Sequence, residues 1–402
     1  MPSATALTNG TVVTPDGALA GHAVVVERGR ISAIAPSASL PSDLTMIDVD
    51  GAFITPGLID VHTHGAMGRS FAEQDEAAYE TILRFMATNG ITLANASLPT
   101  AAFDRLEEQL GWVRDFQGPS DGAVLNGVHL EGPYLSSEDQ ARGAADPNYL
   151  RTPQPQDVSR LAKYADVLAM MTIAPELPGA VPMIRALSEQ GVVMAIGHSS
   201  AESEHFFQAV AAGASHITHL WSGMSNLLRR EKGERIPGLI ECSLASNDLT
   251  AEVIADGHHL PPQLLEIARR CLGGAHQRLC GVSDASIGTG MPEGHRYGRP
   301  DRLVEIRNGV ANLVGQGRFA GSTTALNGMG RTLLSLGWPI TEVVTMLSTV
   351  PACVLSLSAS KGILRPGYDA DIAIFDQKFN CKGAMIGGAW AKTLEGLPVS
   401  AA

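Results

Sequence analysis

Six side chains that can bind metal ions or transfer protons each follow a short apolar run of the sequence. They are His62, His64, Glu131, His198, His219 and Asp284. Side chains two residues apart in a strand point to the same side, so the HxH motif of DVHTHG offers two imidazoles to one metal ion. Imidazole nitrogens and carboxylate oxygens are ligands that zinc and iron accept in proteins. The residue types therefore predict a divalent metal site with a carboxylate at hand for proton transfer.

The apolar runs that lead to these residues indicate eight short β-strands. They cover residues 58–64, 91–97, 124–131, 167–173, 192–198, 215–220, 249–256 and 278–284. Amphipathic helical patterns separate most of them, such as 75–90, where Asn89-Gly90 is expected to end the helix. The alternation predicts an α/β fold with a (β/α)8 TIM-type barrel, and a doubly wound open sheet is the alternative. Only the barrel explains why the six side chains share one rim, where barrel enzymes build their sites.

A single histidine in a strand is more often a hydrogen-bonded core residue than a metal ligand. The placement of all six groups at one end of one predicted barrel favours the metal site here. Two other histidines serve as contrasts. His129 lies two residues before Glu131, one layer deeper, and is expected in the core or behind the ligands. His216 lies three residues before His219 and is expected to point to the other face of its strand.

The two ends of the chain differ in pattern from its central part, because they have short β-type runs and few helical patterns. Residues 22–36 place two β-branched runs around a Glu-Arg-Gly-Arg turn, which predicts a hairpin. The stretch YDADIAIFD near the C-terminus alternates apolar and polar residues in the same way. We therefore expect residues 1–55 and 358–402 to build one small β-sandwich domain, with a barrel over 56–357 inserted between its two parts.

The composition excludes several classes of protein. The chain has 402 residues, of which 45% are hydrophobic, and this supports a large core and argues against disorder. Its 29 basic and 41 acidic residues leave a net charge of −12, which argues against nucleic acid or an anionic membrane as a partner. No apolar run reaches the roughly 18 residues of a membrane span. Five scattered cysteines indicate reduced thiols, so a cytoplasmic location is expected.

Eight segments resemble, in order and over nearly the whole chain, the N-acetylglucosamine-6-phosphate deacetylase branch of the amidohydrolase superfamily. They are DVHTHG, HLEGPYL, IGHSS, THLWSGM, IADGHH, VSDAS, FAGSTTAL and GILRPGYDADIAIFD. HLEGP, with Glu131, is specific to that branch, because most other amidohydrolases place a carbamylated lysine at strand four. Strand four here reads MMTIAPE and has no lysine. The resemblance implies hydrolysis of an N-acetyl group from an amino sugar phosphate, in amino-sugar breakdown.

The resemblance also implies a role for each of the six residues. Glu131, His198 and His219 would hold the principal metal ion. His62 and His64, with Glu131 as a bridge, would complete a second site, so one or two divalent ions, zinc or iron, are expected. Asp284 would be the general base that takes a proton from water and later gives it to the leaving amine. A divalent ion fits this chemistry because it lowers the pKa of water and polarises the amide carbonyl.

Substrate contacts are implied in the same way, for a small amino-sugar ligand. His259 matches a substrate-binding histidine, and the segment Phe319, Ala320 and Gly321 matches a stretch that lines the sugar pocket. Arg235 matches an arginine that binds the sugar phosphate from a neighbouring subunit, which implies a homodimer. Without the resemblance, the charged run 229–235 indicates only a solvated loop.

Three departures from the family pattern occur at positions that are expected to recognise the substrate. Ala144 and Ala145 stand where the family has a Gly-x-His segment after HLEGP, with Ala145 at the position of the histidine. Ser222 and Gly223 replace an Asn-Ala pair, and the loop over 224–235 is longer than expected. The chemistry of hydrolysis is therefore predicted more firmly than the sugar. The alternatives are an amidohydrolase for another N-acyl or cyclic amide substrate, a deaminase, and a non-catalytic barrel that acts as a scaffold.

Overall fold

The computed structural model describes residues 4–229, 233–273 and 277–393. Its centre is an eight-stranded sheet with parallel neighbours throughout, in the order β17-β16-β13-β12-β11-β10-β9-β6. The strands are β6 (Leu58–Asp60), β9 (Ile91–Pro99), β10 (Val124–Glu131), β11 (Leu168–Ile173), β12 (Val193–Ile196), β13 (His216–Ile217), β16 (Thr250–Val253) and β17 (Leu279–Gly281). Each overlaps one of the eight predicted strands, which confirms the strand prediction.

The sheet closes where its first and last strands meet. The segments that follow β6 and β17 form a parallel bridge between Thr63 and Ala285, and the amide of Asp284 donates to the carbonyl oxygen of His62 over 2.9 Å. The open-sheet alternative is therefore wrong, and the predicted barrel is confirmed. Because closure joins the ends of β6 and β17, it places the HxH motif directly beside Asp284.

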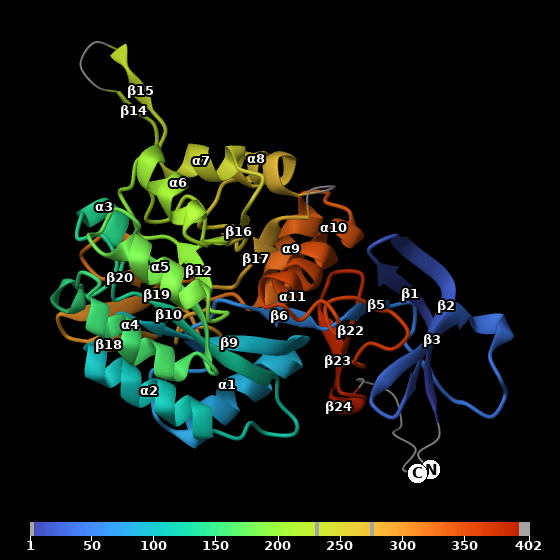
Figure 1. Ribbon diagram of the computed structural model, residues 1–402. Helices are drawn as coiled ribbons and strands as arrows, with labels where there is room; N and C mark the ends of the chain where they lie inside the picture. Colours follow the sequence, from blue (N-terminus) through green and yellow to red (C-terminus); the bar gives the residue numbers. More distant parts are fainter. Residues whose placement is uncertain (1–3, 230–232, 274–276, 394–402) are drawn as a thin grey trace.

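Helices cover the outside of the barrel, as Figure 1 shows. They include α1 (Glu76–Thr88), α2 (Phe103–Asp115), α4 (Pro155–Leu161), α5 (Ala180–Ser188), α6 (Ser203–Ala211), α7 (Leu239–Ala245), α8 (Pro262–Leu272) and α9 (Leu326–Ser335). In α1 the side chain of Asp75 caps the N-terminus, and Asn89 is the C-cap, followed by Gly90 at φ +81°. The predicted end of this helix is confirmed. Among the residues that the structure describes, no helix is long and apolar enough to cross a membrane.

Strands from both ends of the chain form a second eight-stranded sheet. Its order is β24-β23-β22-β5-β1-β2-β3, with β4 paired to β1. The members are β1 (Thr5–Thr14), β2 (Gly17–Glu27), β3 (Arg30–Pro36), β4 (Thr45–Asp48), β5 (Phe53–Pro56), β22 (Ile372–Phe375), β23 (Cys381–Ile386) and β24 (Ala389–Lys392). The hairpin predicted over 22–36 is the antiparallel pair β2–β3. Figure 1 shows these N- and C-terminal strands side by side next to the barrel.

Two small antiparallel elements extend from the barrel. The sheet β18–β21 lies between β17 and α9 and has the strands β18 (Arg296–Arg299), β19 (Arg302–Arg307), β20 (Val310–Leu313) and β21 (Arg318–Phe319). The hairpin of β14 (Leu228–Arg229) and β15 (Arg235–Ile236) falls in the charged run of the sequence, of which residues 230–232 lie outside the described chain. Figure 1 shows this hairpin projecting away from the barrel.

Candidate active site and metal centre

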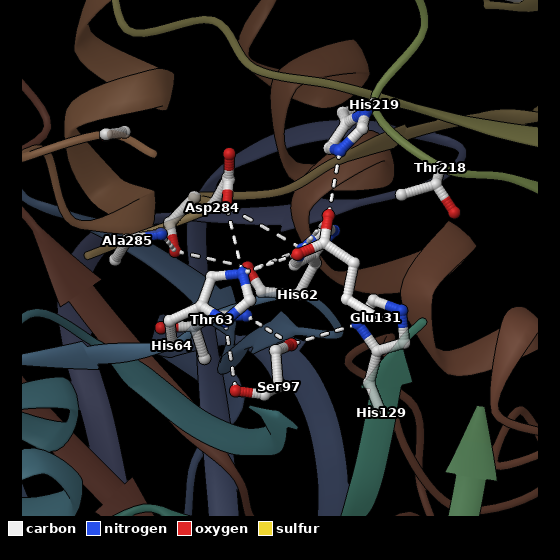
Figure 2. A network of polar contacts seen from close by, with 12 residues as sticks. His62, Thr63, His64, Ser97, His129, Glu131, Thr218, His219, Asp284 and Ala285 are labelled. Atoms are coloured by element: carbon white, nitrogen blue, oxygen red, sulfur yellow. Dashed lines mark hydrogen bonds and ion pairs between the residues drawn. The ribbon is translucent and has the colours of Figure 1, made fainter. Parts of the chain in front are cut away.

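The six predicted residues come together at the C-terminal ends of five barrel strands. His62 and His64 follow β6, Glu131 ends β10, and the other three follow β12, β13 and β17. Their side chains are buried or nearly so, with exposed fractions from 0% for His62 to 15% for His64. Figure 2 shows Glu131 between His219 and the pair formed by His64 and Asp284. The prediction that these six groups share one rim of the barrel is confirmed.

Glu131 lies at the centre of the cluster and touches both halves. Its Oε1 is 2.9 Å from Nε2 of His198 and 3.0 Å from Nε2 of His219. Its Oε2 is 3.2 Å from Nε2 of His64, and Oε1 is 3.6 Å from Nε2 of His62. Among the described residues, two groups have the spacing of metal ligands, and Glu131 is the member that both share.

Asp284 lies beside the HxH pair rather than beside the other two histidines. Its Oδ1 is 3.3 Å from Nε2 of His64 and 3.6 Å from Nε2 of His62. The side chain is 12% exposed, so it reaches the surface of the cavity described below. A carboxylate in this position can exchange a proton with a molecule held over the ligands.

The far nitrogens of three of the four imidazoles, those of His62, His64 and His198, lie within hydrogen-bond distance of acceptors, whereas Nδ1 of His219 has no partner among the described residues. Nδ1 of His64 is 3.0 Å from the carbonyl oxygen of Ser97, and Nδ1 of His198 is 2.9 Å from that of Ala141. Because a carbonyl oxygen only accepts, each Nδ1 carries a proton, which leaves Nε2 as the nitrogen that faces the cluster and can bind a cation once it is deprotonated.

The cluster has the chemistry of a divalent metal site. Four Nε2 atoms and two carboxylates face one another, with 3.0 Å between Nε2 of His198 and Nε2 of His219. Facing lone pairs at that distance repel unless a proton or a cation lies between them. Imidazole nitrogen and carboxylate oxygen are a donor set that suits zinc and iron, so the residues present fit a metal ion.

Inside the cluster, charge pairing has a larger effect than burial on the pKa values of the ionisable groups. Burial alone would raise the pKa of Glu131, yet hydrogen bonds from His198, His219 and His64 hold that pKa well below its usual range. Burial alone would lower the pKa of His62, but Glu252 and the other nearby carboxylates raise it to about 9. The carboxylates of the cluster are therefore ionised, which is the state in which carboxylates bind cations.

The backbone turns sharply at three of the functional residues. His198, His219 and Asp284 have φ angles of +49°, +21° and +44°, in a backbone region that residues other than glycine rarely adopt. Each is a residue at which the chain leaves a barrel strand for the rim. Such strain costs of order 1–3 kcal/mol and is typical of functional sites.

Sequence reasoning missed Glu252, which lies in β16 below the cluster. The side chain is fully buried. Its Oε2 is 2.9 Å from Nδ1 of His62 and also accepts from the amide of His219 over 2.9 Å. The signal was present in the sequence, because LTAEVIAD places one charged residue inside an apolar strand.

The prediction for His216 is wrong, and the prediction for His129 is confirmed. Nε2 of His216 is 3.1 Å from Oε1 of Glu252, so its ring reaches the same buried network as the metal-facing residues. Strand β13 ends at Ile217, and the chain has left the strand before His219, so strand alternation does not relate the two histidines. His129 is fully buried and bonds Ser97 and a threonine behind the ligands.

The cluster opens into a cavity of about 810 Å³. Eight of the nine predicted substrate-contact residues line it. They are Ala144, Ala145, Ser222, Gly223, His259, Phe319, Ala320 and Gly321. Nδ1 of His259 is 2.7 Å from Oδ2 of Asp256, and its ring packs edge-on against Phe319 with 4.9 Å between the ring centres.

Arg235 is the predicted contact that the structure does not bring to the cavity of its own chain. It lies exposed on β15, and it is absent from the described residues that line the cavity. Within one chain, the structure therefore does not bring Arg235 together with the other eight residues.

Comparison with known protein families gives a match over most of the chain. The model of the amidohydrolase family covers residues 53–391. The chain belongs to the amidohydrolase family. Residues 5–54 of this amidohydrolase match the NagA composite domain, which corresponds to the N-terminal part of the second large sheet. Family and ligand cluster together make the chain a metal-dependent amidohydrolase enzyme.

Characterised relatives resemble this amidohydrolase over almost their whole length. It is 32% identical to an N-acetylglucosamine-6-phosphate deacetylase of Vibrio furnissii, over 90% of this chain and 89% of the relative. It is 30% identical to an N-acetylgalactosamine-6-phosphate deacetylase of Escherichia coli O157:H7, over 94% and 97% of the two chains. The crystal structure of N-acetylglucosamine-6-phosphate deacetylase from Pasteurella multocida matches with a TM-score of 0.88 and 26% identity, over 97% of this chain and 100% of that one.

Proposed function

We propose that this amidohydrolase removes the acetyl group of an N-acetylhexosamine 6-phosphate, giving acetate and the free amine. One observation carries the proposal. Asp284 lies 3.3 Å from a ring nitrogen of the ligand cluster, at the floor of a cavity that eight candidate substrate contacts line. The names of the relatives supply the substrate class, since two of them act on amino sugar 6-phosphates.

In the proposed mechanism, Glu131, His198 and His219 would hold a divalent ion, and His62 and His64 with Glu131 are the candidate ligands of a second. A bound ion would supply Lewis acidity, which polarises the acyl carbonyl and lowers the pKa of water. Zinc and iron fit the ligands best.

Asp284 moves the proton in this mechanism. Hydrogen bonding to His64, and the charges of the nearby imidazoles, keep the pKa of Asp284 below its usual value against the effect of burial. The carboxylate is thus free to accept a proton from the attacking water. When the oxygen of that water has bonded to the acyl carbon and the C–N bond breaks, Asp284 returns the proton to the amine nitrogen.

The experiment that tests the proposal is amine release by the purified, metal-reconstituted protein. The substrates are N-acetylglucosamine and N-acetylgalactosamine, each with and without a 6-phosphate. We expect release of amine and acetate in equal amounts from at least one phosphorylated sugar. Absence of release from all four, with metal content verified by mass spectrometry, would reject the proposal.

The galactosamine epimer is the second candidate substrate, because a relative with that printed activity covers 94% of the chain. Ala145 and Ser222 line the cavity at positions where the chain departs from the family pattern. Comparison of kcat/KM between the two phosphorylated epimers decides between them.

We further propose a homodimer in which Arg235 completes the site of the partner subunit. The projecting hairpin that carries Arg235, away from its own cavity, supports this arrangement. Mixing two impaired variants tests it. Dimers formed from Arg235→Gln and Asp284→Asn chains would contain one site with both residues intact, so re-associated mixtures should regain activity that neither variant has alone.

A cytoplasmic location is also part of the proposal. None of the five cysteines forms a disulfide among the described residues, and three of them are buried, which suits a reducing compartment. Fractionation of the native host cell, with the protein detected by antibody, tests this location.

A further inference from the structure

The wall of the cavity on the side of the sheet β18–β21 carries three arginines that neither the sequence reasoning nor the proposed mechanism uses. Arg299, Arg302 and Arg318 all line the cavity. They come from three different strands of the small sheet, β18, β19 and β21. Facing them is the segment 139–146, which begins as the short helix α3 (Asp139–Arg142) and also lines the cavity.

The arginines tie the small sheet to this segment. Arg318 donates to the carbonyl oxygen of Gly143 over 3.2 Å and pairs with Asp139. Arg302 donates to the carbonyl oxygen of Ala144. Beneath these polar contacts, Ala144 packs on a small apolar cluster of the sheet around Val304. The two elements therefore form one continuous wall, and three of the residues that line it are arginines.

Positive charge exceeds negative charge along this wall. Arg142 and Arg318 both contact the carboxylate of Asp139. Arg299 is 2.6 Å from Asp146 and 3.7 Å from the exposed Asp301. Arg302 has no carboxylate within ion-pair distance among the described residues and donates to the carbonyl oxygen of Ala144, although its charge, with that of Arg299, helps to lower the pKa of Asp146. Four guanidinium groups thus lie near three carboxylates, and Arg302 is the one that forms no direct ion pair with them among the described residues.

We infer that Arg302, with Arg318 beside it, binds the phosphate of the substrate within the same chain. This inference rests on the proposed function and deepens it, because it names an in-chain recognition element apart from Arg235 and His259. A guanidinium has five N–H donors in a planar fork that matches phosphate oxygens, and Arg302 uses one nitrogen for Ala144. Ala144 and Ala145, whose side chains end at Cβ, line the same cavity as Arg302 and Arg318.

Steady-state kinetics of Arg302→Gln in the metal-loaded protein test the inference. We expect KM for the phosphorylated N-acetylhexosamine to rise about 10-fold or more, as for loss of a hydrogen bond to a charged group, with kcat nearly unchanged. The unphosphorylated sugar should keep its kcat/KM. Arg302→Lys, which retains the charge, should keep most of the preference for the phosphorylated sugar.

The matched control is Arg296→Gln. Arg296 belongs to the same small sheet, but it pairs with Glu305 over 2.9 Å, is 58% exposed and is not part of the cavity wall. Its loss should leave the preference for phosphate as in the wild type. An equal fall of kcat/KM for both sugars in Arg302→Gln would show that Arg302 only holds the wall together, and would overturn the inference. Loss of the preference in Arg235→Gln alone, with Arg302→Gln unchanged, would overturn it as well.

Calorimetric binding of glucosamine 6-phosphate and glucosamine separates this inference from the proposed function, since binding requires no turnover. A wild-type protein that deacetylates none of the sugars but binds glucosamine 6-phosphate more weakly after Arg302→Gln would reject the proposed function and support the inference. If the wild type is active and Arg302→Gln binds glucosamine 6-phosphate as tightly as the wild type, the proposed function is supported and the inference is rejected.

Discussion

Oε2 of Glu252 lies 2.9 Å from Nδ1 of His62, although the two residues are 190 positions apart in the chain. The same carboxylate contacts His216 through its other oxygen. Burial alone would raise the pKa of Glu252, but the adjacent histidines hold it well below the usual range. Glu252 is thus an ionised buried group that orients the ring of His62, so that Nε2 faces the metal centre.

Replacing Glu252 by glutamine should weaken metal binding about 10- to 100-fold, which is the typical effect of losing a carboxylate behind a ligating histidine. Competition with a chromophoric chelator measures this affinity. Glu107→Gln is the control, because Glu107 pairs with Arg160 on the outside of the barrel and should retain the metal. Unchanged affinity in Glu252→Gln would contradict the orienting role.

Asp284→Asn should lower kcat by roughly 10²- to 10⁴-fold, the usual contribution of a general base. The metal content should stay as in the wild type, because the substitution removes the base and leaves Glu131 and the four histidines in place. Parallel measurement of amine release and of metal by mass spectrometry checks both statements. Wild-type turnover in this variant would remove Asp284 from the mechanism.

Glu131→Gln should lose bound metal from the whole cluster, because Glu131 is common to both ligand groups. Thermal stability should fall as well, since four imidazoles would lose their shared carboxylate. His64→Gln is the informative comparison, because it leaves the group of Glu131, His198 and His219 intact and should keep one ion. Full metal occupancy of Glu131→Gln would argue against a bridging carboxylate.

The pair of Asp256 and His259 should make phosphate recognition depend on pH. Burial lowers the pKa of His259, but the bond to Asp256 and its charge more than offset this, so the pKa lies above the ordinary value. Protonated His259 attracts an anion, so KM for the phosphorylated sugar should rise as pH rises through that pKa.

In Asp256→Asn the increase of KM should begin at a lower pH, because the charge that holds the proton on His259 is gone. The amide oxygen of asparagine can still accept from the backbone amides of residues 258 and 259, which keeps the loop in place. The unphosphorylated sugar is the control and should show no such displacement between the two proteins. Identical pH profiles for the phosphorylated sugar would contradict the pairing.

Local patterns in the sequence were sufficient for the strands and for the ligand cluster. Each apolar run formed a barrel strand, because short buried runs between helices have few other ways to bury their side chains. The HxH motif and Asp284 stood at strand ends, so predicting a closed barrel also predicted their convergence. The boundaries at residues 55 and 357 and the roles of the individual site residues stay predictions.

Other features depend on contacts between distant segments. The contact between His216 and Glu252 follows from the parallel pairing of β13 with β16, in a register that places His216 opposite Thr250 and that no periodic pattern encodes. The pairing of Arg302 with Ala144 joins residues 158 positions apart. Their proximity is decided by how the small sheet β18–β21 packs on the barrel rim.

The sequence by itself thus determined the barrel and the type of its metal ligands, because these follow from local hydrophobic order and from side-chain chemistry, whereas the class of reaction came from the resemblance to a known family. Only the tertiary structure decided that Glu131 is common to two ligand groups, that Glu252 orients His62, and that arginines of a separate sheet line the cavity. The reason is physical: a distance between two side chains depends on the packing of every element that separates them in the chain.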